Sequence, residues 1–325
     1  MKCKYCEKEI YDIKISQFQL NRNKNFYCNR ECYLKYIRKE KIENYNFFSK
    51  INTEEKAYWL GFVYADGNLH SKHKTLSIGL SYGDRKHLEK FSKIFNKKVY
   101  YYSRKQSLNG NKEKIYSAVT VSISSINLYN DLFNLGVYPR KSYINNSDIL
   151  CNIPDNLMNH FIRGYFDGDG SINFSITKDK KNYSLSFAGV YSFLESLSKI
   201  IVNTTGVSSH KVEKGKGVFV LRWGGLRQII ILKNFLYNNA TIFLERKKNI
   251  FNLIEKDIKY NKESSIYRGV TWHKNNKKWL ANISHNKKRI NLGYYDNEIE
   301  AGNAYDIAVI KYNKPLYKLN FRIGD

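Results

Sequence analysis

The sequence predicts an α+β protein with a duplicated central body and a smaller unit at each end. Three observations lead to this fold class. Residues 59–67 and 162–170 repeat one pattern, an apolar run with glycine in third place that ends in a carboxylate followed by glycine. Segments that alternate apolar and polar residues follow each copy, as in half-buried strands. Two cysteine pairs lie near the N-terminus, and a separate pattern of three short strands and one helix begins near residue 263.

Each repeated segment is expected to form a short buried helix. Gly67 is expected to supply the left-handed residue that commonly ends a helix, which puts Asp66 at the negative end of the helix dipole. Asp169 has the same place before Gly170. Because an anion is disfavoured at that end, the pair suggests that a cation binds there. For a single Ala-Asp-Gly, a simple turn is the alternative.

The glycines inside the two segments indicate close packing. Gly61 and Gly164 fall in mid-helix, where glycine is destabilising by roughly 1 kcal/mol relative to alanine. Such glycines are typical of places where another backbone comes very near. If the two helices pack through these glycines, Asp66 and Asp169 lie side by side at one end of the contact.

The flanking elements recur in the same order in both halves. The first half shows strand patterns at 76–80 and 119–123 and helix patterns at 87–95 and 128–135. The second shows strand patterns at 172–176, 185–187 and 218–221 and helix patterns at 193–202 and 229–237. A basic pair closes each half, Arg140-Lys141 and Arg246-Lys247. Two halves, about 45–150 and 151–258, therefore form a pseudo-two-fold body.

The repeated segments resemble the motif of the LAGLIDADG homing endonucleases, in the single-chain form with two copies. The family's helix-contact glycine and metal-binding acid fall on Gly61, Asp66, Gly164 and Asp169. Tyr64 replaces the acid usual at the sixth position, which Asp167 retains. The resemblance implies an αββαββα fold for each half, with two four-stranded sheets that straddle the major groove of DNA.

The same resemblance implies a catalytic site that depends on Mg²⁺. The implied magnesium ligands are two carboxylates and two backbone groups: Asp66, Asp169, Ala65 and Gly168. Magnesium prefers such oxygen ligands, and it would activate water and stabilise the leaving oxygen. Lys141 and Lys247 match the family's active-site lysines by their place in each half. Ordinary phosphate contacts are the alternative for both lysines.

The composition favours a nucleic acid as partner. Lysine and arginine number 55 against 29 acidic residues, which gives a net charge of +26 over 325 residues. This charge exceeds what solubility requires, although an AT-rich genome would also enrich lysine. Basic clusters are expected in hairpin loops that contact DNA, at Arg104, Lys105, Lys112, Lys114 and Lys178 to Lys181, with Lys178 and Lys180 as candidate contacts. Phosphate contacts of this kind make binding fall steeply with salt.

The C-terminal pattern, residues 263–325, is very similar to the AP2 DNA-binding domain. Its signatures are Tyr-Arg-Gly-Val from Tyr267, Leu-Gly-x-Tyr-Asp from Leu292, Ala-Tyr-Asp from Ala304 and Leu-Asn-Phe from Leu319. The resemblance implies that a three-stranded sheet enters the major groove. By position, the candidate DNA contacts are Arg268, Trp272, Lys278, Trp279 and Arg289. A place in the core of the small sheet is the alternative for Trp279.

The N-terminal cysteines have the spacing of a structural zinc site. Two pairs, Cys3 with Cys6 and Cys28 with Cys32, resemble the knuckles of a treble-clef or ribbon zinc finger. A helix over 33–38 would leave the second knuckle, and residues 1–40 would form this unit. Disulfides are the alternative, but the sequence has no apolar signal core. Cys151 is expected to be an ordinary buried thiol.

These expectations define a function. Units at 1–40, 45–258 and 263–325 would form a monomeric, sequence-specific homing endonuclease that breaks both strands of a long DNA site. A non-cleaving DNA-binding regulator and an intron RNA maturase on the same fold are the alternatives. No apolar run approaches the roughly 20 residues of a membrane span. We therefore expect an intracellular protein that is associated with DNA in a bacterial or phage-host cytoplasm or an organelle.

Overall fold

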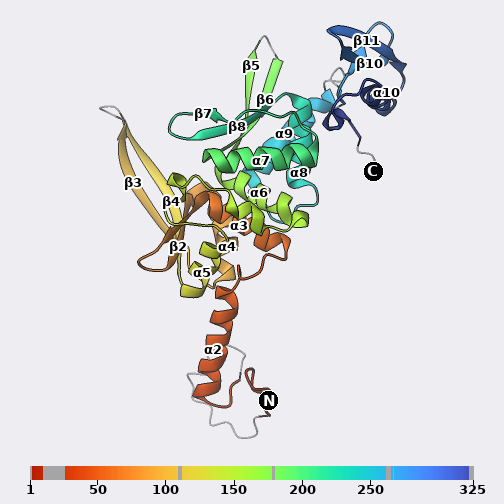
Figure 1. Ribbon diagram of the computed structural model, residues 1–325. Coiled ribbons are helices and arrows are strands. Elements are labelled where there is room, and N and C mark those ends of the chain that lie inside the picture. Colours follow the sequence, from red (N-terminus) through yellow and green to blue (C-terminus); the bar gives the residue numbers. More distant parts are fainter. Residues whose placement is uncertain are drawn as a thin grey trace. The chain divides into compact units, whose positions relative to one another are not determined.

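The structure is a computed structural model that describes residues 2–9, 26–108, 112–177, 180–260, 265 and 267–321. The chain divides into two compact units (Figure 1). One comprises Met1–Lys50 and His70–Leu132, and the other comprises Ile51–Leu69 and Phe133–Asp325. Both repeated helices therefore belong to the second unit.

The first unit contains a long N-terminal helix and most of an antiparallel sheet. Its elements are α2 (Arg30–Tyr45), β2 (Thr75–Ser81), η1 (Tyr82–Asp84), α4 (Arg85–Ile94), β3 (Tyr100–Leu108), β4 (Lys112–Ser124) and most of α5 (Ile126–Asn134). The strand order is β1-β2-β4-β3, where β1 (Gly67–His70) carries the chain from one unit to the other. Alternate residues such as Ile78 and Val121 pair in register and are buried, which confirms the period-two patterns.

The second unit repeats this architecture. Its elements before the C-terminal region are α3 (Glu54–Asp66), η2 (Lys141–Tyr143), η3 (Asp148–Asn152), η4 (Asp155–Leu157), α6 (Met158–Asp169), β5 (Gly170–Thr177), β6 (Lys180–Gly189), α7 (Tyr191–Thr205), β7 (Glu213–Lys214), β8 (Phe219–Gly224), α8 (Leu226–Tyr237) and α9 (Glu245–Tyr260). The strand order β5-β6-β8-β7 matches the first sheet strand for strand. The duplication expected from the sequence is therefore confirmed in the topology of the two sheets.

The C-terminal region is a small sheet with one packing helix, as expected. Strands β9 (Val270–His273), β10 (Lys278–His285) and β11 (Lys288–Tyr295) are antiparallel in the order β11-β10-β9. Helix α10 (Glu298–Lys311) precedes η5 (Leu316–Lys318). The helix buries Ala301, Tyr305 and Val309 against Ile283 and its neighbours.

The glycines that end α3 and α6 differ from the expectation. Gly67 has φ −74° and ψ 142°, and Gly170 has φ −85° and ψ 160°, so both are extended and neither is left-handed. The chain passes directly from each helix into a strand. A Cβ on either glycine would lie 2.5 Å from the carbonyl oxygen of Val63 or Phe166. Glycine is therefore required for space at these positions, and the prediction of a left-handed stop was wrong.

Two further expectations need correction. Arg104, Lys105, Lys112 and Lys114 lie in strands β3 and β4, because the strands extend almost to the turn of the hairpin. Lys180 likewise belongs to β6, and Lys178 lies outside the described residues. Cys151 is exposed in η3, since this short helix turns its thiol away from the core.

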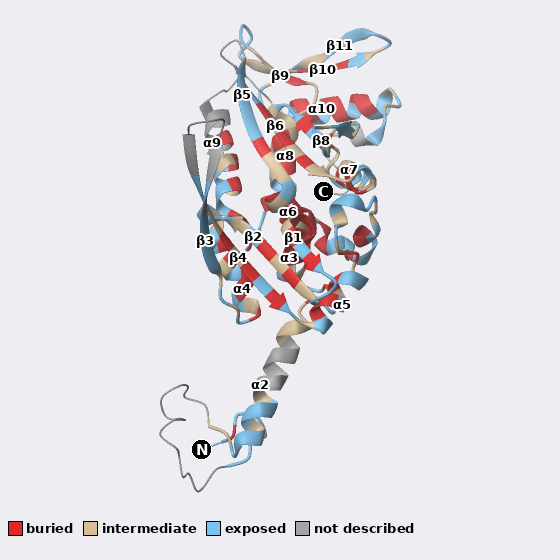
Figure 2. Cartoon of the chain, turned by 90° about the vertical axis from the view of Figure 1, so that its left-hand side faces the viewer, coloured by how far each residue is buried: buried red, intermediate tan, exposed pale blue. Residues whose placement is uncertain are grey.

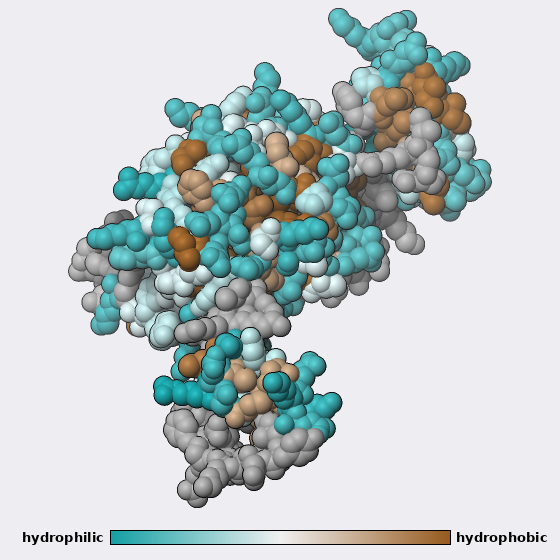
Figure 3. All heavy atoms as spheres, turned by 60° about the horizontal axis from the view of Figure 1, so that its bottom comes forward, coloured by the Kyte–Doolittle hydropathy of each residue, from teal (hydrophilic) through white to brown (hydrophobic). Residues whose placement is uncertain are grey.

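Buried residues concentrate in the two repeated helices. Figure 2 shows α3 and α6 mostly in red, the colour of buried residues. Hydrophilic residues cover much of the face drawn in Figure 3, with groups of apolar residues among them. Among the described helices, none combines the length and the apolar character needed to cross a bilayer.

Candidate active site

Helices α3 and α6 meet through reciprocal contacts of their glycines. A Cβ on Gly61 would lie 2.0 Å from the carbonyl oxygen of Phe161, and one on Gly164 would lie 1.9 Å from that of Tyr58. In each case the touched carbonyl stands three residues before the other glycine. The two helices therefore make the same contact in both directions, and a side chain at either glycine would force them apart.

This contact brings the two acids to the same end. Asp66 is the last residue of α3, and Asp169 is the last residue of α6. Oδ2 of Asp66 lies 3.3 Å from the position that a Cβ on Gly168 would take, so this carboxylate lies near the residue that precedes Asp169. Burial, and then the charge of Asp169, raise the pKa of Asp66 to about 6. The side chain of Asp169 is more exposed, but the surrounding protein still raises its pKa by desolvation.

Each half contributes one lysine to this end of the helices. Lys141, in η2, donates a hydrogen bond to the carbonyl of Gly67. Lys247, near the start of α9, donates to the carbonyls of Gly170 at 2.6 Å, Phe166 at 2.5 Å and Gly168 at 3.1 Å. Both lysines thus bind the glycine that follows their own acid. Burial lowers the pKa of both, that of Lys247 to about 8.

The electrostatic pairing of acids and lysines is crossed between the halves. After burial and the charge of Asp169, Lys247 has the larger effect on the pKa of Asp66, ahead of Lys141. For Asp169 the order of the two lysines is reversed, with Lys141 first. Geometry groups the same residues in two clusters. Lys247 donates to the carbonyl of Gly168, and Asp66 lies near Gly168, whereas Lys141, Asp169 and Ala65 line one cavity.

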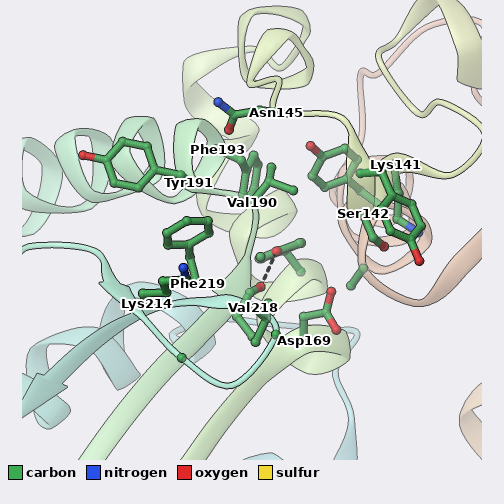
Figure 4. A pocket seen from close by; sticks show the side chains of 18 residues that line it. Lys141, Ser142, Asn145, Asp169, Val190, Tyr191, Phe193, Lys214, Val218 and Phe219 are labelled. Carbon is green, nitrogen blue, oxygen red and sulfur yellow. Dashed lines mark hydrogen bonds between the residues drawn. The ribbon is translucent and has the colours of Figure 1, made fainter.

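A cavity of about 700 Å³ lies beside the second cluster. Figure 4 shows Lys141 and Asp169 on one side of it, with the rings of Tyr191, Phe193 and Phe219 opposite. The open wall gives Asp169 access to solvent and to a ligand.

The donor atoms at this end fit a hard divalent cation. Two carboxylates lie close enough to raise the pKa of Asp66, and backbone groups adjoin them. A cation between them would relieve this repulsion, and oxygen ligands suit Mg²⁺. Asp66, Asp169 and the backbone of Ala65 and Gly168 could hold such an ion.

A buried polar network on α6 was not recognised in the sequence. Arg163 and Asp167 are 0% and 1% exposed, and both bind the segment that follows α8. The sequence carried a signal for this, because two charged residues interrupt the apolar run of the second repeat. The first repeat has Leu60 and Tyr64 at these places.

The four N-terminal cysteines form a compact cluster. The Sγ atoms of Cys3, Cys6, Cys28 and Cys32 all lie within 4.8 Å of one another. All four are free thiols, so the alternative of disulfides is not realised in the described residues. A tetrahedron of Zn–S bonds of about 2.3 Å places its sulfurs about 3.8 Å apart. The cluster could therefore hold a metal ion, and α2 begins between its last two cysteines.

The candidate contacts of the C-terminal sheet lie on different faces. Arg289 pairs with Ser284 on the outer face, where its Nε donates to Oδ1 of Asn282 at 2.8 Å. Trp279 packs with its partner Trp272 on the helix side of the sheet, as in the core alternative. Lys278, on the outer face, pairs with Asp296 at 3.2 Å. Arg268 lies in the turn before β9, where its backbone N–H binds Asn320 at 2.6 Å.

Comparison with known proteins identifies the C-terminal region. Residues 265–315 match the family model of the AP2 domain. An AP2-like ethylene-responsive transcription factor of Arabidopsis thaliana is 39% identical over 74 residues, which cover 20% of this chain and 17% of the relative. The transcription factor ANT of the same plant is 34% identical over 82 residues, 25% of this chain and 15% of the relative. The chain therefore spans only about a sixth of these relatives, and the similarity concerns one domain.

The chain is also similar, at low identity, to solved structures over about two thirds of its length. The homing endonuclease I-WcaI, bound to its DNA recognition sequence, has 13% identity and a TM-score of 0.48, and the match covers 66% of this chain and 92% of that one. The LAGLIDADG homing endonuclease I-LtrWI, bound to target DNA, has 13% identity and a TM-score of 0.43 over 68% and 92%. The DUF199/WhiA protein from Thermatoga maritima has 17% identity and a TM-score of 0.40 over 66% and 65%.

Proposed function

We propose that this protein is a sequence-specific DNA endonuclease of the LAGLIDADG type that breaks both strands at a long target site. One observation carries the proposal. Helices α3 and α6 contact each other reciprocally at Gly61 and Gly164, and each helix ends in an acid, Asp66 or Asp169, followed by a glycine whose carbonyl accepts a hydrogen bond from Lys141 or Lys247. Two matched clusters suit duplex DNA, whose two strands also have a two-fold relation.

The residues of each cluster have distinct roles in the proposed reaction. Asp66 and Asp169 would bind the catalytic Mg²⁺, together with the backbone of Ala65 and Gly168. When bound, magnesium activates water for attack and stabilises the leaving oxygen. Lys141 and Lys247 keep positive charge where negative charge develops on the scissile phosphate. The contact between α3 and α6 fixes the separation of the two acids, so that each acid can serve one strand of the same duplex.

The surfaces around the acids would supply DNA binding. The outer face of the second sheet carries small polar side chains together with Asn173 and Arg222, both exposed. Side chains of this type read base edges in the major groove. Within the first unit, Arg104 and Lys105 of β3 would be further contacts, and so would Lys180 at the start of β6, with Lys178 near it in sequence. A net charge of +26 attracts the phosphate backbone.

The end units would extend the recognised site. The AP2 domain would add contacts from Arg268, Lys278 and Arg289, with Trp272 and Trp279 supporting its sheet. The cysteine cluster would hold a structural Zn²⁺. Linked binding modules raise the effective concentration of the nuclease body near its target. The protein is expected to bind DNA as a monomer and to act in homing.

Cleavage assays with single variants test this proposal. The substrate is a plasmid with the DNA sequence that flanks the gene when the gene itself is removed, incubated with MgCl₂ or with EDTA. We expect a metal-dependent double-strand break by the wild type, and Asp66→Asn and Asp169→Asn should each lose the double-strand break and leave at most a nick in one strand. Asp155→Asn, a matched change of an exposed carboxylate in η4, should cut normally.

The same assays distinguish the alternative functions. Tight, metal-independent binding of the duplex without any nick would favour a non-cleaving regulator. Preference for intron RNA over duplex DNA would favour a maturase. Unchanged cutting in both aspartate variants would show that the reaction takes place elsewhere in the protein.

A further inference from the structure

We infer that the two cleavage centres are unequal, and that the centre with Asp66 and Lys247 cuts its strand first. The inference rests on the proposed function. Its basis is a network of buried hydrogen bonds that holds the Lys247 segment, with Arg163 and Asp167 as positioning residues. The pseudo-symmetric positions of the first repeat carry leucine and tyrosine.

Arg163 anchors the chain between α8 and α9. Its Nε donates to the carbonyl of Ile242 and its Nη1 to that of Leu236, both at 2.9 Å. Its Nη2 binds Oε1 of Glu54 at 2.6 Å, and the same oxygen accepts the N–H of Thr241 at 2.9 Å. One buried guanidinium and its carboxylate partner thus fix two points of this connection, at Thr241 and Ile242, and the last turn of α8 at Leu236. Since both groups are largely removed from water, loss of either contact would be costly.

Asp167 anchors the same segment one turn further along α6. Its Oδ2 accepts the backbone N–H of Leu244 at 2.7 Å and the hydroxyl of Tyr58 at 2.7 Å. Its Oδ1 accepts the hydroxyl of Tyr237 at 2.6 Å. The carboxylate therefore joins α3, α6, α8 and the residues that precede α9.

The anchored residues lead directly into the first turn of α9, which carries Lys247. The backbone N–H of Lys247 binds the carbonyl of Leu244 at 3.1 Å, so the anchored residue starts the first turn of α9. The lysine is only 3% exposed, and its Nζ meets three carbonyls at the end of α6. Both its backbone and its side chain are held before any substrate binds.

The other centre, with Lys141 and Asp169, has no equivalent network of buried hydrogen bonds among the described residues. Leu60 has no polar side-chain atom to replace the guanidinium of Arg163. Tyr64 replaces Asp167, and its hydroxyl makes a long contact of 3.4 Å with the carbonyl of Asn146. Lys141 is less buried than Lys247, lies in a short 3-10 helix and lines the open cavity with Asp169.

Pre-organisation should decide the order of cutting. A catalytic group that is already in place loses less freedom when the substrate binds. The Nζ of Lys247 is held by three carbonyls, whereas the Nζ of Lys141 donates to one described carbonyl, that of Gly67, at the edge of a cavity. The wild type should therefore accumulate a nicked intermediate in which one particular strand is cut.

Strand-resolved kinetics test this inference. A duplex labelled differently on its two strands gives both cleavage rates in one reaction, and Asp66→Asn and Asp169→Asn show which strand each acid serves. Tyr237→Phe removes one hydrogen bond to Asp167 and keeps the ring. It should slow cleavage of the Asp66 strand about tenfold and leave the other strand within about twofold. Tyr129→Phe, the same change in a buried tyrosine of α5, should slow neither strand.

A second variant keeps the inference testable if Tyr237→Phe fails to fold. Glu54→Gln weakens the anchor of Arg163 and should produce the same bias between strands. A merely structural effect would slow both strands equally, and this result would overturn the inference, as would equal rates in the wild type. Absence of cleavage in every protein, wild type included, would instead refute the proposed function.

Discussion

Replacement of Gly61 by alanine tests the contact that the catalytic geometry depends on. The added Cβ would lie 2.0 Å from the carbonyl oxygen of Phe161, whereas real Cβ atoms essentially never come within 3.0 Å. The helices would have to separate by about 1 Å, and no rotamer can relieve a contact between two backbones. Overpacking typically costs about 1–3 kcal/mol. We expect the upper end, about 3 kcal/mol, reduced by the roughly 1 kcal/mol by which alanine favours helix.

The assay is urea unfolding followed by helical circular dichroism, together with the plasmid cleavage rate. Gly164→Ala should lose as much stability as Gly61→Ala, because its contact of 1.9 Å is equivalent. Gly83→Ala is the matched control, since nothing lies within 4 Å of its added Cβ. Both helix variants should also cut more slowly, as the acids move apart. A Gly61→Ala protein as stable and as active as the Gly83→Ala control would refute the close contact.

Three further predictions concern pH, metal and DNA. Burial opposes ionisation of Glu54, but the N–H of Thr241 and the charge of Arg163 together lower its pKa. The ionised Glu54 should therefore stabilise the fold fully above its ordinary pKa of 4.5, and this stabilisation should be lost as the pH falls below that value. In urea titrations, Glu54→Gln should lower the free energy of unfolding by about 1–2 kcal/mol at pH 7 and hardly change it at pH 3. Cys3→Ser should lower the zinc content measured by mass spectrometry and reduce helix α2 in circular dichroism, and an unchanged zinc content would contradict the cysteine site. If Arg289 contacts a phosphate, Arg289→Ala should reduce the slope of the log binding constant for DNA against log salt concentration by about 0.9. Trp279→Ala should chiefly lower the melting temperature of the C-terminal region, because the ring of Trp279 packs against its core.

Local patterns were sufficient for most of the secondary structure. Period-two segments became β2, β4, β5 and β8, and the helix patterns became α4, α5, α7 and α8, because alternation and helical spacing are properties of neighbouring residues. Arg104 and Lys105 were expected in a hairpin loop but belong to strand β3, which the sequence did not indicate, because its run of tyrosines and basic residues lacks alternation. The extended form of Gly67 was also missed, since it depends on how the chain leaves the helix for the next strand.

The candidate site was recognisable from the sequence as a set of residues but not as an arrangement. The spacing of Asp66 and Asp169 with Lys141 and Lys247 indicated one acid and one lysine in each half. In the structure Lys141 and Asp169, which belong to different halves, line the same cavity, a relation between segments that the sequence separates.

By itself, the sequence determined the duplicated halves, the two acids at the helix ends, the cysteine pairs and the AP2 pattern, because repeats and spacings are written in neighbouring residues. Only the tertiary structure decided which lysine lies near which acid and how Arg163 and Asp167 hold the Lys247 segment. These contacts form only when segments that are distant in sequence pack together in the folded core. The partner of a buried charge therefore depends on tertiary packing.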